Sequence, residues 1–158
     1  MFRKMLRPKQ QLPEADCIEM LKTEPRGVLS LLGDDDYPYG IPMNHWYNPE
    51  DGKLYFHCGK VGHKLDALQK HSKVSFCVCD QGTRKEGDWA LTFRSVIVFG
   101  KAEMVTDQEK AAEAIRQLCY KFTSDEAYIN EEFRKFSART LCFALTPEHI
   151  SGKTVHEA

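Results

Sequence analysis

The 158-residue sequence has no apolar run near the roughly 20 residues that a membrane-spanning helix needs. Residues 1–11 are basic, but they lack the apolar stretch and the small-residue cleavage site of a secretory signal. The chain also lacks an excess charge of either sign, because 22 basic and 23 acidic residues give a net charge of −1. We therefore expect a cytoplasmic protein that binds neither membranes nor nucleic acid.

Paired cysteine spacing and metal-binding motifs are missing as well. Six cysteines are scattered along the chain, mostly in apolar stretches, which predicts reduced thiols. His57, Cys58, His63 and His71 lie close in sequence, but no H-E-x-x-H motif, C-x-x-C motif or carboxylate at ligand spacing accompanies them, so we predict no metal site. His57 and Cys58 are neighbours on an expected strand and point to opposite faces, which argues against a Cys–His nucleophile.

Strand patterns fill much of the chain. Residues 26–32 and 39–47, separated by a turn-rich segment, predict an antiparallel hairpin, and residues 54–57 predict a third strand. Residues 73–79 alternate between polar and apolar side chains, as a half-buried strand does. Residues 89–105 form a long β-rich run, in which we expect a bulge or bend at its interrupting glycine, position 100.

Helical patterns are short, and they do not alternate regularly with the strands. We expect three or four helices, with helical patterns over residues 13–23, 63–71, 108–122 and 125–136. The third is preceded by a capping box, in which Thr106 and Glu109 satisfy free backbone amides. A final strand covers residues 139–146 and is expected to end at Pro147.

The order of these elements predicts a mainly β protein. Hairpin-connected strands come first, which argues against a doubly wound parallel sheet and favours an antiparallel barrel of six or seven strands with peripheral helices. No linker or internal repeat divides the chain. We expect an N-terminal arm of residues 1–12 and a single domain of residues 13–158.

One strand-to-helix junction has the composition of an anion site. Residues 56–64 leave a strand, cross Gly59 and Gly62, and enter a helix with His63 and Lys64 in its first turn. Glycines let backbone amides approach a ligand closely, while the helix start and the lysine favour a negative charge. The glycine spacing fits neither a P-loop nor a dinucleotide-binding fingerprint. The junction is therefore either a phosphate site or an ordinary solvated loop.

Aromatic side chains gather in the strand-rich half, between Tyr37 and Phe93. They fit either a barrel core and dimer contact or the packing around a planar cofactor. The pattern alone does not separate these two interpretations.

Four short motifs, taken in order, resemble a known family. They are Arg26-Gly-Val-Leu, Tyr39-Gly-Ile-Pro-Met-Asn44, Leu54-Tyr-Phe-His-Cys with Gly62-His-Lys64, and Ser95-Val-Ile-Val-Phe-Gly-Lys-Ala102. Over about residues 15–153, their order and spacing are similar to those of the 5-nitroimidazole-resistance flavoproteins, which belong to the pyridoxamine 5′-phosphate oxidase-like superfamily. The resemblance implies a six-stranded antiparallel split β-barrel that forms a homodimer and holds FMN in clefts between the two subunits.

The resemblance also implies how the flavin ring is held. Pro42, Met43 and Asn44 lie on the strand whose backbone is expected to run along the isoalloxazine. Ser95 matches the polar position at which the long strand reaches the flavin, and Trp89 is a further candidate.

The phosphate end falls on the junction described above. His57 and Cys58 sit where the third strand is expected to contact the ribityl-phosphate, and His63 and Lys64 occupy the basic pair expected to hold the phosphate itself.

The activity implied by the resemblance is an FMN-dependent oxidoreductase that reduces nitroaromatic or similar electron-poor small molecules. The flavin supplies the chemistry, and no catalytic residue is assigned, although His57 or His45 could donate a proton. One alternative is a non-catalytic flavin- or haem-binding module. Another is a pyridoxamine phosphate oxidase, which is disfavoured because Trp46 replaces a basic residue of that enzyme and its arginine-rich C-terminal motif is missing.

Overall fold

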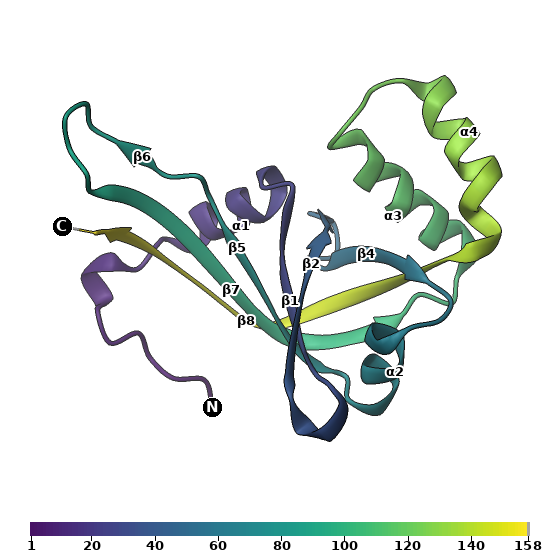
Figure 1. The fold of residues 1–158 in the computed structure, drawn as a ribbon, viewed down its shortest axis with the longest axis horizontal. Coiled ribbons are helices and arrows are strands. Elements are labelled where there is room, and N and C mark those ends of the chain that lie inside the picture. Colours follow the sequence, from purple (N-terminus) through teal and green to yellow (C-terminus); the bar gives the residue numbers. More distant parts are fainter. Residues whose placement is uncertain (158) are drawn as a thin grey trace.

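A computed structural model describes residues 1–157. One antiparallel sheet runs through the protein (Figure 1). Its strands are β1 (Arg26–Leu32), β2 (Pro38–Asn44), β3 (Trp46–Tyr47), β4 (Leu54–Gly59), β5 (Lys73–Cys79), β6 (Thr83–Arg84), β7 (Leu91–Met104) and β8 (Thr140–His156). The spatial order is β2-β1-β5-β7-β8-β4-β3, with β6 beside β7. The mainly β fold class is confirmed, although the eight strands exceed the expected six or seven.

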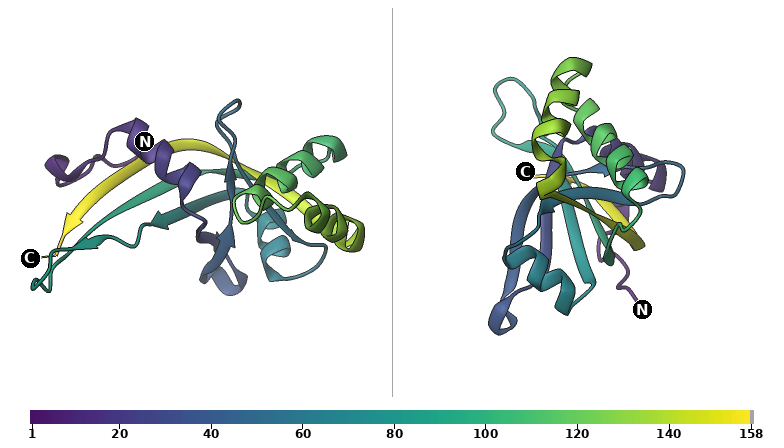
Figure 2. Two further views of the ribbon diagram at one scale, coloured as in Figure 1. Left: turned by 90° about the horizontal axis from the view of Figure 1, so that it is seen from above. Right: turned by 90° about the vertical axis from the view of Figure 1, so that its right-hand side faces the viewer.

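The sheet curls because its two ends are joined by a very short connection. β2 and β3 lie at opposite ends of the strand order, yet only His45 separates them in the chain. The edges of the sheet must therefore approach each other at this residue, which produces a split barrel rather than an open sheet. Figure 2 shows the resulting curvature, with the long β7 and β8 bending across the molecule.

A bulge interrupts the pairing of the two longest strands. Phe99 pairs with His149 but Gly100 pairs with Pro147, so Glu148 is the extra residue. A Cβ atom at Gly100 would collide with the carbonyl oxygen of Thr146, so this close approach of the two backbones requires glycine. The bulge expected at this glycine is confirmed.

The expected end of the last strand at Pro147 is wrong, since β8 continues to His156. The pairing of β8 with β4 ends at Leu145, so beyond that point β7 is the one strand of residues 1–157 that pairs with β8, apart from an isolated bridge between Gln11 and Lys153. Proline is tolerated at such positions because its missing N–H costs no ladder bond at a bulge or on an unpaired side.

Four α-helices surround the sheet: α1 (Glu14–Thr23), α2 (His63–Lys70), α3 (Gln108–Tyr120) and α4 (Glu126–Phe136). Three short 3₁₀ segments are η1 (Pro8–Gln10), η2 (Asp34–Asp36) and η3 (Ser137–Arg139). The expected Thr106 cap of α3 is wrong by one residue, because the carboxylate of Asp107 accepts hydrogen bonds from the backbone amides of Glu109 and Lys110. None of the helices among residues 1–157 has the length and apolar character needed to cross a bilayer.

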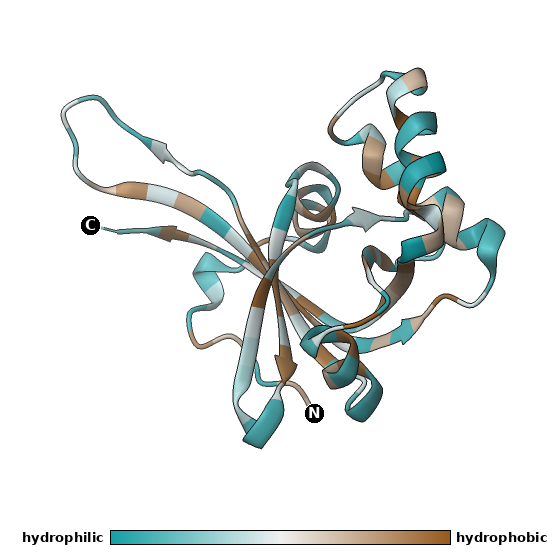
Figure 3. Ribbon diagram, turned by 45° about the vertical axis from the view of Figure 1, so that its right-hand side comes forward, coloured by the Kyte–Doolittle hydropathy of each residue, from teal (hydrophilic) through white to brown (hydrophobic). Residues whose placement is uncertain are grey.

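The core lies inside the curl of the sheet, where Figure 3 shows the most hydrophobic strand segments crossing. Phe56 and Phe143 stack with ring centroids 4.9 Å apart, and Phe76 meets Phe56 edge-on at 5.1 Å. All three rings are completely buried, so the strands that carry them, β4, β5 and β8, are packed into one body.

Residues 1–12 lie along β7 and β8. Phe2 stacks on His149 with ring centroids 4.7 Å apart, and the Leu12 amide donates to the carbonyl oxygen of Gly152 over 2.9 Å. The division into an arm and a domain stays a prediction.

Candidate functional site

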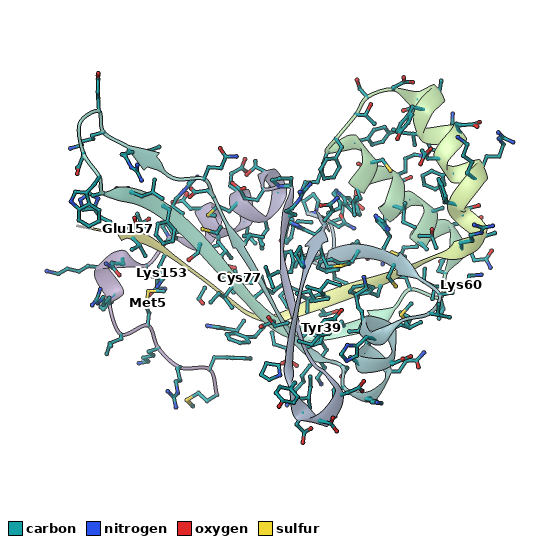
Figure 4. The ribbon with its side chains drawn as sticks, viewed as in Figure 1. Met5, Tyr39, Lys60, Cys77, Lys153 and Glu157 are labelled. Carbon is teal, nitrogen blue, oxygen red and sulfur yellow. The ribbon has the colours of Figure 1, made fainter. Side chains whose placement is uncertain are left out.

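A cleft of about 200 Å³ lies where β4 ends and α2 begins. One wall comes from β2, and the other comes from the end of β4 with the loop and first turn that follow it. Its lining residues are Tyr39, Ile41, Cys58, Gly59, Val61, Gly62, His63, Lys64 and Leu65. Figure 4 labels Tyr39 on β2 and Lys60 in the loop after β4. The predicted anion junction is therefore hollow rather than filled by other side chains.

The start of α2 is built around a glycine that no other residue replaces easily. Gly62 has a φ of +131°, a conformation that side chains rarely allow, and a Cβ atom there would meet nothing within 4 Å. The next residue begins α2, whose first backbone N–H groups have no partner within the helix. Open space in front of a helix N-terminus favours an anion.

Lys64 carries a positive charge into the cleft without a carboxylate to neutralise it. Its ammonium donates to the sulfur of Met43 over 3.2 Å, and a thioether is a weak acceptor. Within residues 1–157, Lys64 forms no salt bridge with an acidic side chain. The side chain is half-buried, so this unbalanced charge favours a bound anion.

His63 lines the same cleft but is held by the β1–β2 turn. Its ring stacks on Tyr39 with centroids 4.3 Å apart, and its Nε2 accepts a hydrogen bond from the Asp34 amide over 3.2 Å. The Asp34 carboxylate lies 3.6 Å from the same nitrogen and 3.2 Å from Lys70 Nζ. His63 therefore joins the first turn of α2 to the hairpin that forms the opposite wall.

His57 and Cys58 occupy opposite faces of β4, as expected. Cys58 is buried and lines the cleft, whereas His57 is exposed on the other face. Burial raises the pKa of the Cys58 thiol, which keeps it in its unreactive neutral form. Partial desolvation by the surrounding protein, together with the charge of Lys64, lowers the pKa of His57. The ring of His57 is therefore mostly neutral at pH 7.

The residues expected along the flavin ring do not all reach this cleft. Met43 touches Lys64, and Asn44 accepts a hydrogen bond from Arg26 Nε over 3.1 Å. Pro42 points to the exposed side of β2. Ser95 pairs with residues of β5 and β8, and Trp89 is 71% exposed in the loop before β7. Neither of these two residues lines the cleft of its own chain.

Sequence reasoning missed the β2 wall. Tyr39 and Ile41 line the cleft and share a strand face with Met43, so the alternation of β2 could have identified them. His45, suggested as a proton donor, is unsuited to that role because it is completely buried. Burial and the nearby charge of Lys121 lower the pKa of His45 to about 3. No group of three or more potential metal ligands is present within residues 1–157.

The family model for pyridoxamine 5′-phosphate oxidase matches residues 13–154. The chain belongs to this family. The resemblance found in the sequence motifs is thereby supported for nearly the whole chain. The comparison with curated proteins gave no match.

Solved structures with this fold include three from bacteria whose names mention resistance or flavin. A 5-nitroimidazole antibiotic resistance protein from Bacteroides thetaiotaomicron is 19% identical, with 92% of this chain and 87% of that chain covered and a TM-score of 0.74. The flavocytochrome Anf3 from Azotobacter vinelandii is 20% identical, with 97% and 72% covered and a TM-score of 0.76. An FAD-binding protein from Mycobacterium smegmatis is 21% identical, with 94% and 99% covered and a TM-score of 0.68. These likenesses establish the split-barrel fold.

Proposed function

We propose that the protein binds FMN, with the phosphate in the cleft at the start of α2, and that it works as a flavin-dependent reductase. The observation that carries the proposal is the ammonium of Lys64, whose only partner among residues 1–157 is the Met43 thioether and which stands beside the open helix N-terminus at Gly62. The family match and the flavin-binding proteins among the structural neighbours support the same ligand class.

The size of the cleft favours a second copy of the chain as part of the site. Sites for drug-sized ligands are typically about 300–1,000 Å³, so the cleft suits the phosphate end and leaves the flavin ring outside it. The side of the sheet away from the core, which we call the outer face, exposes apolar side chains: Val28 is 42% exposed, Ile97 37% and Phe99 39%. Val28 and Ile97 both pair with Cys77 in the sheet register, so they form one row.

A homodimer through the outer face would cover this apolar row and give the flavin ring a second wall. It would also provide a role for Ser95 and Trp89, which do not line the cleft of their own chain. In this proposal they reach the flavin of the partner subunit. Ile97→Glu is expected to shift the protein to monomers in sedimentation analysis and to weaken FMN binding. A dimer that persists in this variant would exclude the outer face as the interface.

The protein's own residues would bind, orient and shield the cofactor. Lys64 and the first amides of α2 hold the phosphate, and Tyr39 and Ile41 shape the apolar wall of β2. Bound FMN supplies hydride or electron transfer to an electron-poor substrate such as a nitroaromatic compound. His57, suggested as a proton donor, lies on the face of β4 away from the cleft and has a lowered pKa, so the proposal gives it no catalytic role.

The activity test uses protein purified with FMN and assayed with NADH or NADPH and a 5-nitroimidazole. Cofactor-dependent loss of the nitro group's absorption is expected, and its absence from flavin-loaded protein with either donor would reject the reductase proposal. A flavin absorption band without turnover would favour a binding module, and a sharp Soret band would favour haem. Peroxide release from pyridoxamine phosphate would instead identify the oxidase activity of the family's name.

A further inference from the structure

The corner between β2 and β3 determines how the two walls of the cleft are placed. The Tyr39–Ile41 wall is on β2, whereas β4, which ends in the opposite wall, pairs with β3. Only His45 joins β2 to β3, so its backbone is the one short link between the walls on this side of the barrel. A small movement of this residue would change the spacing of the cleft.

Two side chains hold the corner. The buried ring of His45 places Nε2 2.7 Å from the carbonyl oxygen of Leu21 in α1. Lys121, immediately after α3, donates to the carbonyl oxygen of His45 over 2.9 Å and to that of Glu24 over 2.6 Å. One ammonium therefore connects the ends of α1 and α3 to the corner. Met43, which contacts Lys64, lies two residues before His45 in the chain.

We propose that Lys121 is a positioning residue for the flavin site, which holds the corner at His45 so that the walls on β2 and β4 are spaced to bind the FMN phosphate. This inference rests on the proposed FMN site. Lys121 does not line the cleft, so its influence passes through the backbone of His45 and the strands on either side.

The protonation state of Lys121 gives this role a measurable signature. Burial lowers the pKa of Lys121 to about 8, and the Glu24 carboxylate opposes that shift only in part. The titratable groups that face it are Glu24 from the end of α1 and His45 from the corner, and His45 stays neutral near pH 8. Loss of the proton weakens two charge-assisted hydrogen bonds, because a neutral amine is a poorer donor. FMN affinity should then decrease as the pH rises through about 8.

The experiment measures the FMN dissociation constant of the full chain between pH 7 and 9.5. Three proteins are compared: the unaltered chain, Lys121→Arg, which remains charged over this range, and Lys121→Met, which cannot donate. The unaltered chain is expected to lose roughly tenfold in affinity with a midpoint near pH 8, as two charge-assisted bonds weaken. Lys121→Arg should bind without that midpoint, and Lys121→Met should bind about tenfold more weakly at pH 7.

The outcomes separate this inference from the proposed function. No FMN binding by the unaltered chain at pH 7 would overturn both. Tight binding that is constant from pH 7 to 9.5, or a midpoint near pH 8 that persists in Lys121→Arg, would overturn the role of Lys121 alone. The unaltered chain and Lys121→Arg are enough to test the role of Lys121. The test therefore still works if Lys121→Met does not fold.

Discussion

Burial of His45 makes the stability of this protein dependent on pH between about 3 and 6.5, and His57, whose pKa is also lowered, adds to the same loss in acid. The ring is completely buried, its Nδ1 has no hydrogen-bond partner within residues 1–157, and its pKa is about 3 because of burial and the charge of Lys121. In the unfolded chain, a histidine has a pKa near 6.5. Between these two values, the unfolded state binds a proton that the folded state does not. Acid therefore favours unfolding.

The magnitude follows from the two pKa values. The contribution of His45 to the free energy of unfolding is complete above pH 6.5, and it decreases as the pH falls from 6.5 to about 3. Lowering the pH from 7 to 5 should cost about 2 kcal/mol of unfolding free energy, and lowering it to 4 about 3 kcal/mol. Asp51 and Asp80 add little between pH 7 and 5. Hydrogen bonds involving Tyr55 and Arg94 outweigh the effect of burial and lower the pKa of these carboxyls, so their contributions are lost mainly below pH 4.

Urea denaturation at pH 7, 6 and 5, followed by circular dichroism, measures this loss. In His45→Gln the amide can still donate to the carbonyl oxygen of Leu21 but does not titrate, so the decrease between pH 7 and 5 should largely disappear. His71→Gln, which removes an exposed histidine, is the matched control and should retain the full decrease. An equal pH dependence in His45→Gln and the unaltered chain would show that another group causes the loss of stability in acid.

Two further predictions concern the fold. Gly100→Ala should lower the unfolding free energy by about 1–3 kcal/mol or more, because the new methyl group meets the Thr146 carbonyl oxygen at the bulge; an unchanged melting temperature would contradict this close approach. Asp107→Ala should cost about 1 kcal/mol through loss of the α3 cap, whereas Thr106→Ala should change denaturant stability little; the reverse order would show that the expected capping box forms in solution.

Local patterns predicted the parts of the fold that depend on neighbouring residues. The β1–β2 hairpin, β5 and α2 follow from turn residues, alternation and helical spacing, and the structure confirms them. The expected strand over residues 39–47 is wrong at its end, because the chain leaves β2 at His45 and enters β3, which pairs with β4. The predicted end of β8 was wrong, because a proline such as Pro147 normally terminates a strand and the prediction relied on that rule. The strand tolerates this proline because β8 has a bulge against β7 there and because the pairing with β4 has already ended. Both features depend on distant strands, so the residues next to Pro147 do not reveal them.

In the candidate site, too, local sequence predicted some residues and long-range contacts determine the others. Cys58, His63 and Lys64 come from one continuous junction, so sequence alone brought them together. The strand register, which depends on long-range pairing, places Ser95 away from that cleft. Lys121 was not identified at all, since its partners are backbone carbonyls from two other elements, and backbone groups leave no signature in the sequence.

Lys64 and the start of α2 are proposed to hold a flavin phosphate, and a comparison of FMN with riboflavin tests this assignment. Riboflavin has the same ring but no phosphate, so Lys64→Met should weaken FMN binding by about 1–3 kcal/mol and leave riboflavin binding unchanged. Lys73→Met, at an exposed position outside the cleft, is the matched control and should affect neither ligand. Equal losses for FMN and riboflavin in Lys64→Met, or no loss for FMN, would contradict the assignment of this cleft to the phosphate.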